Sequence, residues 1–233
     1  YDSLALKADG TVVAWGYNSD GQADVPEGLD SVKAIAAGYY HSLALKTDGT
    51  VVAWGYDEDG ETDTSSLTNI IAIAAGEYVT VALKGDGTVV VLGGPNQMQP
   101  PEDLTDVVAI SCTFRHVLAL KSDGSIVAWG NNTIPSVPGP LVVINGPLNV
   151  PSLKIKAIGN GEGHIVALMD NGTVKASGLN DSQQTEVPED LKNVTKIAVG
   201  ANHTLALKSN GLVVAWGDDG PGKSCIQTNL NLL

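Results

Sequence analysis

A Trp-Gly dipeptide, or a close variant of it, recurs through the 233-residue chain, and this repeat constrains the fold more than any other feature. Successive copies lie 39, 38, 37, 48 and 39 residues apart. The six copies are Trp15-Gly16, Trp54-Gly55, Leu92-Gly93, Trp129-Gly130, Ser177-Gly178 and Trp216-Gly217. A period of about 40 residues predicts a repeat architecture, in which each unit is one supersecondary element stacked on its neighbours.

Each repeat contains two short alternating runs, such as SLALK and TVVAWG, with a turn dipeptide between them. Asp-Gly or Asn-Gly between β-rich runs predicts a hairpin, because both residues of the favoured two-residue turn adopt positive φ. The turn dipeptides are Asp9-Gly10, Asp48-Gly49, Asp86-Gly87, Asp123-Gly124, Asn171-Gly172 and Asn210-Gly211. We therefore expect six hairpins.

A third apolar run, rich in Ala and Gly, precedes most of the hairpins and predicts an inner strand packed closely against its neighbours. These runs cover residues 32–38, 70–76, 107–113, 155–161 and 196–202. Val-Pro or Pro-Pro segments at 25–26, 100–101 and 187–188 suggest a short fourth, outer strand. Three or four antiparallel strands in each repeat of about 40 residues, without a helical period, predict an all-β protein, a β-propeller with six or seven blades.

The repeats predict one propeller domain over residues 1–217, followed by a non-repeat tail over 218–233. The long 48-residue interval holds a segment around 131–150 rich in Pro, Gly and Asn. Because the repeat resumes in phase after it, we expect this segment to be an enlarged surface loop. The chain begins inside a blade, so the strand that completes that blade would come from upstream, from the tail or from a neighbouring chain.

Composition excludes several classes of partner. Asp and Glu total 26 against 13 Lys and Arg, for a formal charge of −13, and Arg115 is the one arginine. Nucleic-acid binding is therefore not expected, because it depends on clustered basic residues. The longest apolar runs, such as 70–76, are far shorter than the roughly 20 residues of a membrane span.

The two cysteines, Cys112 and Cys225, could form one disulfide or remain two free thiols. We expect an extracellular or cell-surface protein, with a cytoplasmic location as the alternative.

The repeat resembles that of the regulator of chromosome condensation family. The pattern AxxAGxxHSLALKxDGTVVAWGxNxxGQxxVP is seen from Ala34 to Trp54 and again from Gly16 to Pro26. The short repeat is similar to that of stand-alone members such as the propeller-type β-lactamase inhibitory protein. The resemblance covers residues 1–217 and implies a propeller of typically seven blades, with guanine-nucleotide exchange on a small GTPase as one known activity.

Histidines and tryptophans recur at fixed repeat positions, which favours structural roles. The histidine position precedes the first hairpin strand and holds Asp2 and Val79 in two repeats. We expect each His to hydrogen-bond to the backbone and so hold adjacent strands together. A shared metal site is not expected, because residues that recur once per blade lie too far apart to bind one ion. The tryptophans are expected to pack between blades. The structural residues are His41, His116, His164, His203, Trp15, Trp54, Trp129 and Trp216.

The two positions before the histidine differ from blade to blade, whereas scaffold positions repeat. Tyr, Phe and Arg are enriched in binding hot spots, and these positions follow a glycine at a strand-to-strand turn, so several blades would present them on one rim. In the propeller inhibitor that the chain resembles, the corresponding turn supplies aromatics that contact the partner. With the tyrosines that follow the Trp-Gly pair, the partner-binding candidates are Tyr39, Tyr40, Glu77, Tyr78, Phe114, Arg115, Tyr17 and Tyr56.

Catalytic and cofactor motifs are absent from the sequence. No G-x-S-x-G, H-E-x-x-H or Walker pattern occurs, and the acidic residues of 57–63 lack the twelve-residue ligand pattern of a calcium loop. We therefore expect no enzyme, no cofactor and no metal. Exposed Tyr beside Asn and Asp would suit a glycan, although no spacing selects one.

Three functions follow as hypotheses. The first is a β-propeller scaffold that binds a protein partner through a rim of aromatic and polar residues. The second is a structural subunit or segment of an extracellular or surface assembly, in which an open blade edge pairs with another chain. The third is guanine-nucleotide exchange on a small GTPase.

Overall fold

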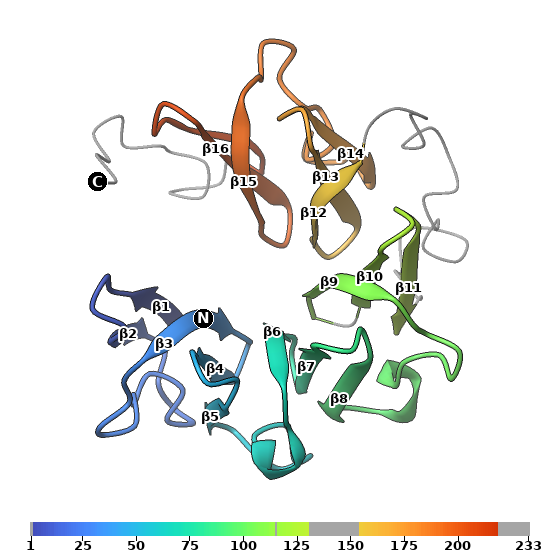
Figure 1. The fold of residues 1–233 in the computed structure, drawn as a ribbon. Coiled ribbons are helices and arrows are strands. Elements are labelled where there is room, and N and C mark those ends of the chain that lie inside the picture. Colours follow the sequence, from blue (N-terminus) through green and yellow to red (C-terminus); the bar gives the residue numbers. More distant parts are fainter. Residues whose placement is uncertain (1, 115, 131–153, 219–233) are drawn as a thin grey trace. The chain divides into compact units, whose positions relative to one another are not determined.

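The computed structural model describes residues 2–114, 116–130 and 154–218, and Figure 1 shows their strands. The described residues form 17 strands in six antiparallel sheets, one of two strands and five of three. Their contacts divide them into two units. Unit 1 holds residues 2–114, 116–123 and 129–130, and unit 2 holds residues 124–128 and 154–218. The insertion predicted at 131–150 and the tail after Asp218 lie outside the described residues.

Unit 1 contains four blades that all use the same hairpin. Their strands are β1 (Asp2–Leu6), β2 (Val12–Gly16), β3 (Val32–Ala37), β4 (His41–Lys46), β5 (Val51–Gly55), β6 (Ile70–Ala75), β7 (Val79–Lys84), β8 (Val89–Gly93), β9 (Val107–Cys112), β10 (His116–Lys121) and β11 (Ile126–Gly130). β11 spans the division between the two units. In the three complete blades an inner strand pairs with the middle strand, and the middle strand pairs with the outer one.

Unit 2 contains two further blades with the same strand order. Their strands are β12 (Ile155–Asn160), β13 (His164–Met169), β14 (Val174–Gly178), β15 (Val194–Val199), β16 (His203–Lys208) and β17 (Val213–Gly217). The six predicted hairpins and the five predicted inner strands are thus confirmed. β15 begins two residues before the run predicted at 196–202, because Val194 still pairs with Lys208.

The hairpin turns differ from the predicted type. Gly49 has a φ of 89°, but Asp48 is not among the residues with positive φ. Lys46 N–H donates to Thr50 O at 2.8 Å and Gly49 N–H to Lys46 O at 3.0 Å, so the loop has three residues and the glycine alone takes the left-handed conformation. Asp48 Oδ1 accepts from Thr50 N–H at 2.9 Å, which explains the Asp at this place without a positive φ.

The predicted fourth strand does not form in the described residues. At each proline segment the chain turns, because the proline carbonyl accepts a hydrogen bond from the N–H three residues ahead. Leu29 bonds to Pro26 at 3.2 Å, Leu104 to Pro101 at 3.1 Å and Leu191 to Pro188 at 3.0 Å. A proline has no N–H of its own for a strand ladder, so a turn is the better use of this position. Two 3₁₀ turns, η1 (Thr64–Ser66) and η2 (Asn96–Met98), lie in such loops.

The apolar core of each unit lies between neighbouring blades. In unit 1, Leu45 and Val51 of one blade pack with Ile70 and Ala82 of the next. In unit 2 the corresponding cluster joins Val166 and Leu168 to residues of the next blade, including Trp216. The middle strands β4 and β13 lie between two blades of their unit and have every residue buried except Lys46. Burial of this kind is the main stabilising term that each blade gains from its neighbour.

The glycine of the Trp-Gly pair is needed for a close approach between strands. Gly55 has a φ of 108°, and a Cβ at this residue would lie 2.5 Å from Tyr40 O. Gly178 in unit 2 has a φ of 121° and the same conflict with Gly163 O, at 2.3 Å. An L side chain would be strained at both places, so the repeat retains glycine while the residue before it varies.

Candidate interaction surface

His41 and His164 each face the next blade of their own unit. His41 Nε2 lies 3.0 Å from Thr80 Oγ1 of the next blade, and in unit 2 His164 Nε2 lies 3.2 Å from Thr204 Oγ1. Both histidines are fully buried. Burial lowers the pKa of each imidazole to about 4, so both are neutral at pH 7. These partners are side chains of the neighbouring blade, whereas the sequence predicted backbone partners.

Two blades carry other residues at the histidine position, and the facing residue changes with them. Ser42 Oγ lies 2.9 Å from Asp2 Oδ2, so a Ser hydroxyl and a carboxylate replace the His–Thr pair. Val79 is followed in the next blade by Val117 instead of Ser or Thr, and both valines are buried. In these pairs, each within one unit, the two facing positions are both polar or both apolar. This avoids a buried hydroxyl without a hydrogen bond.

The tryptophans connect each blade to the loop of the blade before it. Trp54 Nε1–H donates to Gln22 O at 2.9 Å, Trp129 Nε1–H to Met98 O at 2.8 Å, and Trp216 Nε1–H to Gln184 O at 3.1 Å. All three rings are buried. Trp15 differs, because 54% of it is exposed.

In three loops the residue six positions after the Trp-Gly glycine is buried, which the sequence analysis missed. Gln22 Oε1 accepts from Asp20 N–H at 2.9 Å, and Gln184 Oε1 accepts from Ser182 N–H at 2.8 Å. Glu61 takes this place in the loop between β5 and β6, where its Oε2 accepts from Asp59 N–H at 3.0 Å. Burial is the main cause that raises the pKa of Glu61. The recurrence of Gln or Glu at this repeat position, as Gln22, Glu61 and Gln184, was the sequence signal for it.

Five of the predicted partner-binding residues come together in unit 1. Tyr40 is central: its ring stacks on Tyr78 with centroids 5.1 Å apart and planes 18° apart, and lies 6.0 Å from Tyr56 and 6.3 Å from Tyr39. Tyr56 and Tyr78 are 5.5 Å apart, and Tyr39 meets Phe114 edge-on at 5.1 Å. We call this group, Tyr39, Tyr40, Tyr56, Tyr78 and Phe114, the aromatic cluster; each member is half-buried.

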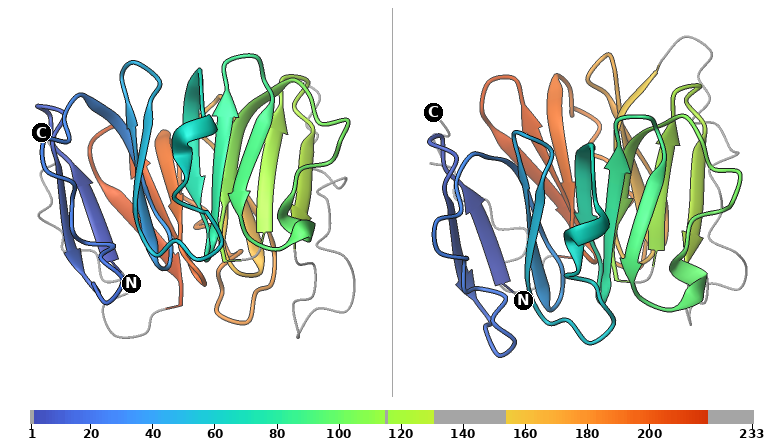
Figure 2. Two further views of the ribbon diagram at one scale, coloured as in Figure 1. Left: turned by 90° about the horizontal axis from the view of Figure 1, so that it is seen from below. Right: turned by 60° about the horizontal axis from the view of Figure 1, so that its bottom comes forward.

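The aromatic cluster lies at one end of the blades. The strand registers place Tyr40 beside the last residues of β3 and β5, at the end opposite the hairpin turn at 47–49. Tyr39 N–H donates to Gly76 O at 3.1 Å, which aligns this end with that of the next blade. We call the end of unit 1 that carries Tyr40 the aromatic end, and the opposite end, which carries the hairpin turns, the hairpin end. In Figure 2 the hairpin turns of unit 1 point the same way.

Carboxylates surround the aromatic cluster. Tyr56 Oη donates to Glu58 Oε2 at 2.7 Å, and this bond is the main cause that raises the pKa of Tyr56 to about 12. Desolvation is the main cause that raises the pKa of Tyr78 to about 12, and the nearby charges of Glu77 and Asp59 contribute. The phenols are therefore neutral at physiological pH, and the negative charge of this surface belongs to the carboxylates.

The remaining candidates lie apart from the cluster or outside the described residues. Tyr17 is 48% exposed in the equivalent loop of the first blade. Glu77 is half-exposed and precedes Tyr78. Arg115 lies outside the described residues, as does Cys225, while the Cys112 thiol donates to Thr113 O at 3.3 Å.

The loop carboxylates bind backbone amides of their own loops. Asp57 Oδ1 accepts from Thr62 N–H at 3.0 Å, as Asn18 and Asn180 accept in the equivalent loops. Across the described residues, no group of three or more His, Cys, Asp or Glu could hold a metal ion. In the same part of the chain, no helix is long and apolar enough to cross a membrane.

Unit 2 builds the same turns without aromatic residues. Leu179 N–H donates to Gly163 O at 2.7 Å, as Tyr56 N–H donates to Tyr40 O at 3.0 Å. A Cβ on Gly163 would lie 2.3 Å from Leu179 Cδ1, so the leucine fills the space of a side chain there. Ala201 and Asn202 occupy the turn of the last described blade. The blade therefore does not require aromatic rings at these positions.

Comparison with known proteins agrees with this architecture. Four segments, residues 3–22, 32–61, 107–133 and 194–222, match the Regulator of chromosome condensation (RCC1) repeat. The structure of Kap60 bound to yeast RCC1 (Prp20) superposes with a TM-score of 0.72 over 93% of this chain and 68% of that one, at 22% identity. The chain therefore carries four RCC1 repeats, and its fold is that of the RCC1-type β-propellers.

Two further solved structures and one curated sequence are also similar to the chain. Prp20p of Saccharomyces cerevisiae, from a study of its binding to Gsp1p and histones, has a TM-score of 0.72 at 21% identity, over 93% of this chain and 69% of that one. The CRINKLY ectodomain of the Arabidopsis thaliana receptor kinase ACR4 has a TM-score of 0.67 at 19% identity, over 93% and 76%. Protein pim1 of Schizosaccharomyces pombe is 30% identical over 103 residues, 32% of this chain. That alignment spans 19% of Pim1, about a fifth of its length.

Proposed function

We propose that the chain is a non-enzymatic interaction module that binds a protein partner through the aromatic end of unit 1. One observation carries the proposal: unit 2 makes the same turns with Gly163, Leu179 and Ala201, so the aromatic cluster is not a requirement of the blade. Half-buried tyrosines supply large contact area at low conformational cost, because their rings already pack on one another. The RCC1-repeat fold is compatible with this use, since yeast RCC1 binds Kap60.

A capture experiment tests the proposal. Proteins retained from an extract would be compared between the wild type and Tyr40→Ala/Tyr78→Ala. The control is Ile71→Ala/Val108→Ala, which truncates two apolar side chains that are 51% and 53% exposed on inner strands of the same unit. We expect the double tyrosine variant to lose a protein that the wild type and the control both retain. Equal retention by all three chains would contradict the proposal, provided that circular dichroism shows all three folded.

Self-assembly is a second candidate, and one observation favours it. Trp15 is 54% exposed and Val13 is 38% exposed, whereas the equivalent Trp54, Trp129 and Trp216 are covered by the preceding blade. An exposed tryptophan beside a two-stranded sheet would suit pairing with another chain. Light scattering over a concentration series would detect it as a rise in mass that Trp15→Ala removes, and a constant monomer mass would contradict it.

Nucleotide exchange is not carried over from the yeast relatives, because they share only 21–22% identity with this chain. The extracellular or cell-surface location stays a prediction.

A further inference from the structure

We propose that the partner presents an arginine- or lysine-rich segment to the aromatic end of unit 1, where carboxylates surround stacked tyrosine rings. This inference rests on the proposed function and names the chemistry of its partner. It follows from how charge is distributed between the two ends of the unit.

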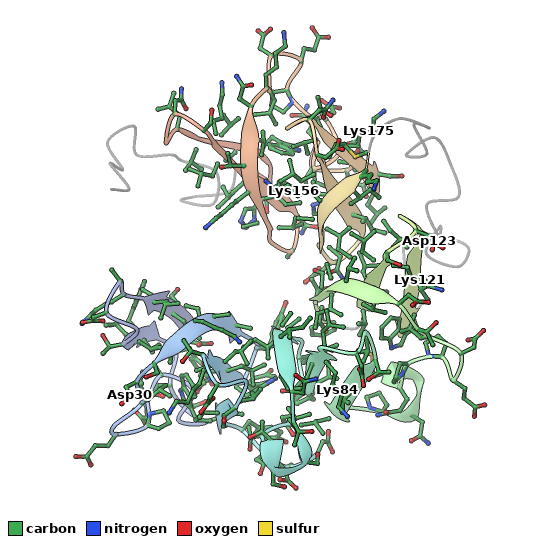
Figure 3. The ribbon with its side chains drawn as sticks, in the orientation of Figure 1. Asp30, Lys84, Lys121, Asp123, Lys156 and Lys175 are labelled. Carbon is green, nitrogen blue, oxygen red and sulfur yellow. The ribbon has the colours of Figure 1, made fainter. Side chains whose placement is uncertain are left out.

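Basic residues of unit 1 lie at the hairpin end. Lys46, Lys84 and Lys121 are the last residues of β4, β7 and β10, and Figure 3 labels the latter two. Lys7 flanks the first hairpin turn, where its N–H donates to Thr11 O, and Lys33 lies at the start of β3. In the described part of unit 1, the aromatic end therefore has no lysine.

Carboxylates of the hairpin end lie near its lysines, as Asp9 does to Lys7 and Asp30 to Lys46 at 3.4 Å, whereas those of the aromatic end have no lysine beside them in the described part of unit 1. Asp57, Glu58 and Asp59 follow Tyr56 and are exposed, and Glu77 precedes Tyr78. Glu58 accepts the Tyr56 hydroxyl at 2.7 Å, so one carboxylate is fixed at the edge of the cluster. Arg115 adds one positive charge to the sequence of these turns against four negative ones. The net charge of this end is negative, in a chain whose formal charge is −13.

Stacked tyrosines beside carboxylates favour a cationic side chain over other groups. A guanidinium stacks on an aromatic face within about 6 Å of the ring centroid. Its N–H groups point outward in the plane of the guanidinium, where they can bond carboxylates beside the ring. An ammonium gains the same electrostatic attraction without the planar fit. An acidic segment would be repelled, and a purely apolar one would bury the carboxylates without a partner. Charge complementarity therefore selects a basic protein segment.

The test uses a fluorescent peptide that alternates glycine and arginine, with blocked ends, and a matched peptide with citrulline in place of arginine. Fluorescence anisotropy would report binding to the full chain at physiological salt. Glu58→Gln/Asp59→Asn removes two charges from the aromatic end. Its control, Glu102→Gln/Asp103→Asn, removes two exposed charges of the same types from the loop before β9, at the hairpin end. Both variants have the same net charge.

We expect the arginine peptide to bind and the citrulline peptide to bind about tenfold more weakly. Glu58→Gln/Asp59→Asn should weaken arginine binding about threefold to tenfold, and the control should stay within about twofold of the wild type. Tyr40→Leu/Tyr78→Leu, which keeps every charge, should also weaken it. Equal losses in the two charge variants would show only non-specific attraction to an acidic chain and would overturn the inference, as would equal binding of the two peptides.

The proposed function and this inference fail differently. If Tyr40→Ala/Tyr78→Ala loses a captured protein that Glu58→Gln/Asp59→Asn retains, the aromatic end binds a partner of other chemistry. If no protein depends on the tyrosines, the proposed function itself is wrong.

Discussion

Unit 1 and unit 2 share their internal bonds and differ in what they expose. The His–Thr pair between blades occurs in both, at 3.0 Å for His41 and 3.2 Å for His164. The tryptophan bond to the preceding loop also occurs in both, from Trp54 and from Trp216. At the turn before the histidine, however, unit 1 has Tyr39 and Tyr40, whereas unit 2 has glutamate, glycine, alanine and asparagine.

Under the proposed function, this difference separates the residues that the fold requires from those that bind a partner. Residues that connect blades repeat because each blade must bury one side against the next. Residues that vary at an unchanged backbone turn have no such role, so their chemistry is available for a partner. Changes to the connecting residues should therefore affect both units alike, and changes to the aromatic cluster should affect binding more than stability.

Acid should destabilise both units through their buried histidines, and this is the largest effect we expect. The pKa of His41 and His164 is about 4 in the folded chain, below the ordinary value of 6.5. Between these pH values the unfolded chain takes up a proton that the folded chain does not. The free energy of unfolding should therefore fall as pH drops from 6.5 to 4. The loss should reach about 3 kcal/mol for each histidine, measured by urea unfolding across that range.

The natural pair Val79 and Val117 supplies the control for this pH effect. His41→Val/Thr80→Val copies it in unit 1, and His164→Val/Thr204→Val copies it in unit 2. Each double variant should remove the part of the pH dependence of unfolding that its own histidine causes. An unchanged pH profile in both variants would mean that other groups cause the acid sensitivity.

Removing the tryptophan bond should have a smaller effect in both units. Trp54→Phe and Trp216→Phe each remove one donor from a buried carbonyl, so each should lower the free energy of unfolding by about 1 to 3 kcal/mol. Trp54→Phe should lie at the low end, because Gln22 O also lies 2.9 Å from the Ser42 hydroxyl. Trp15→Phe should change it by less than about 0.5 kcal/mol, because more than half of Trp15 is exposed. Thermal or urea unfolding measures all three, and a loss in Trp15→Phe equal to that in Trp54→Phe would contradict this role.

Glu61→Gln should raise stability slightly, and only in unit 1. Glu61 Oε1 is buried with no hydrogen-bond partner among the described residues, and burial raises the pKa of its carboxyl. Because the folded pKa lies above the unfolded one, ionisation destabilises the fold as pH rises through this range. The variant should gain about 1 kcal/mol at pH 7. This gain should vanish near pH 4, and a variant that is less stable at pH 7 would contradict the argument.

The repeat allowed the hairpins, the inner strands and the Trp-Gly positions to be predicted, because each depends on local pattern. The prolines at Pro26 and Pro188 were misread as strand residues, since a strand and a β-turn both accept proline at their edge. The partners Thr80 and Thr204 were missed because they alternate with apolar residues along a buried strand and belong to the next repeat. The contacts within the aromatic cluster also required the structure, which shows three blades converging.

The central claim is that the aromatic cluster binds a partner and is not needed by the blade. Tyr40→Gly/Tyr56→Leu tests it most directly, because it gives unit 1 the residues that unit 2 has at Gly163 and Leu179. We predict a folded chain whose free energy of unfolding falls by no more than about 3 kcal/mol and which no longer captures the partner retained by the wild type. Undiminished capture by this folded variant would contradict the account.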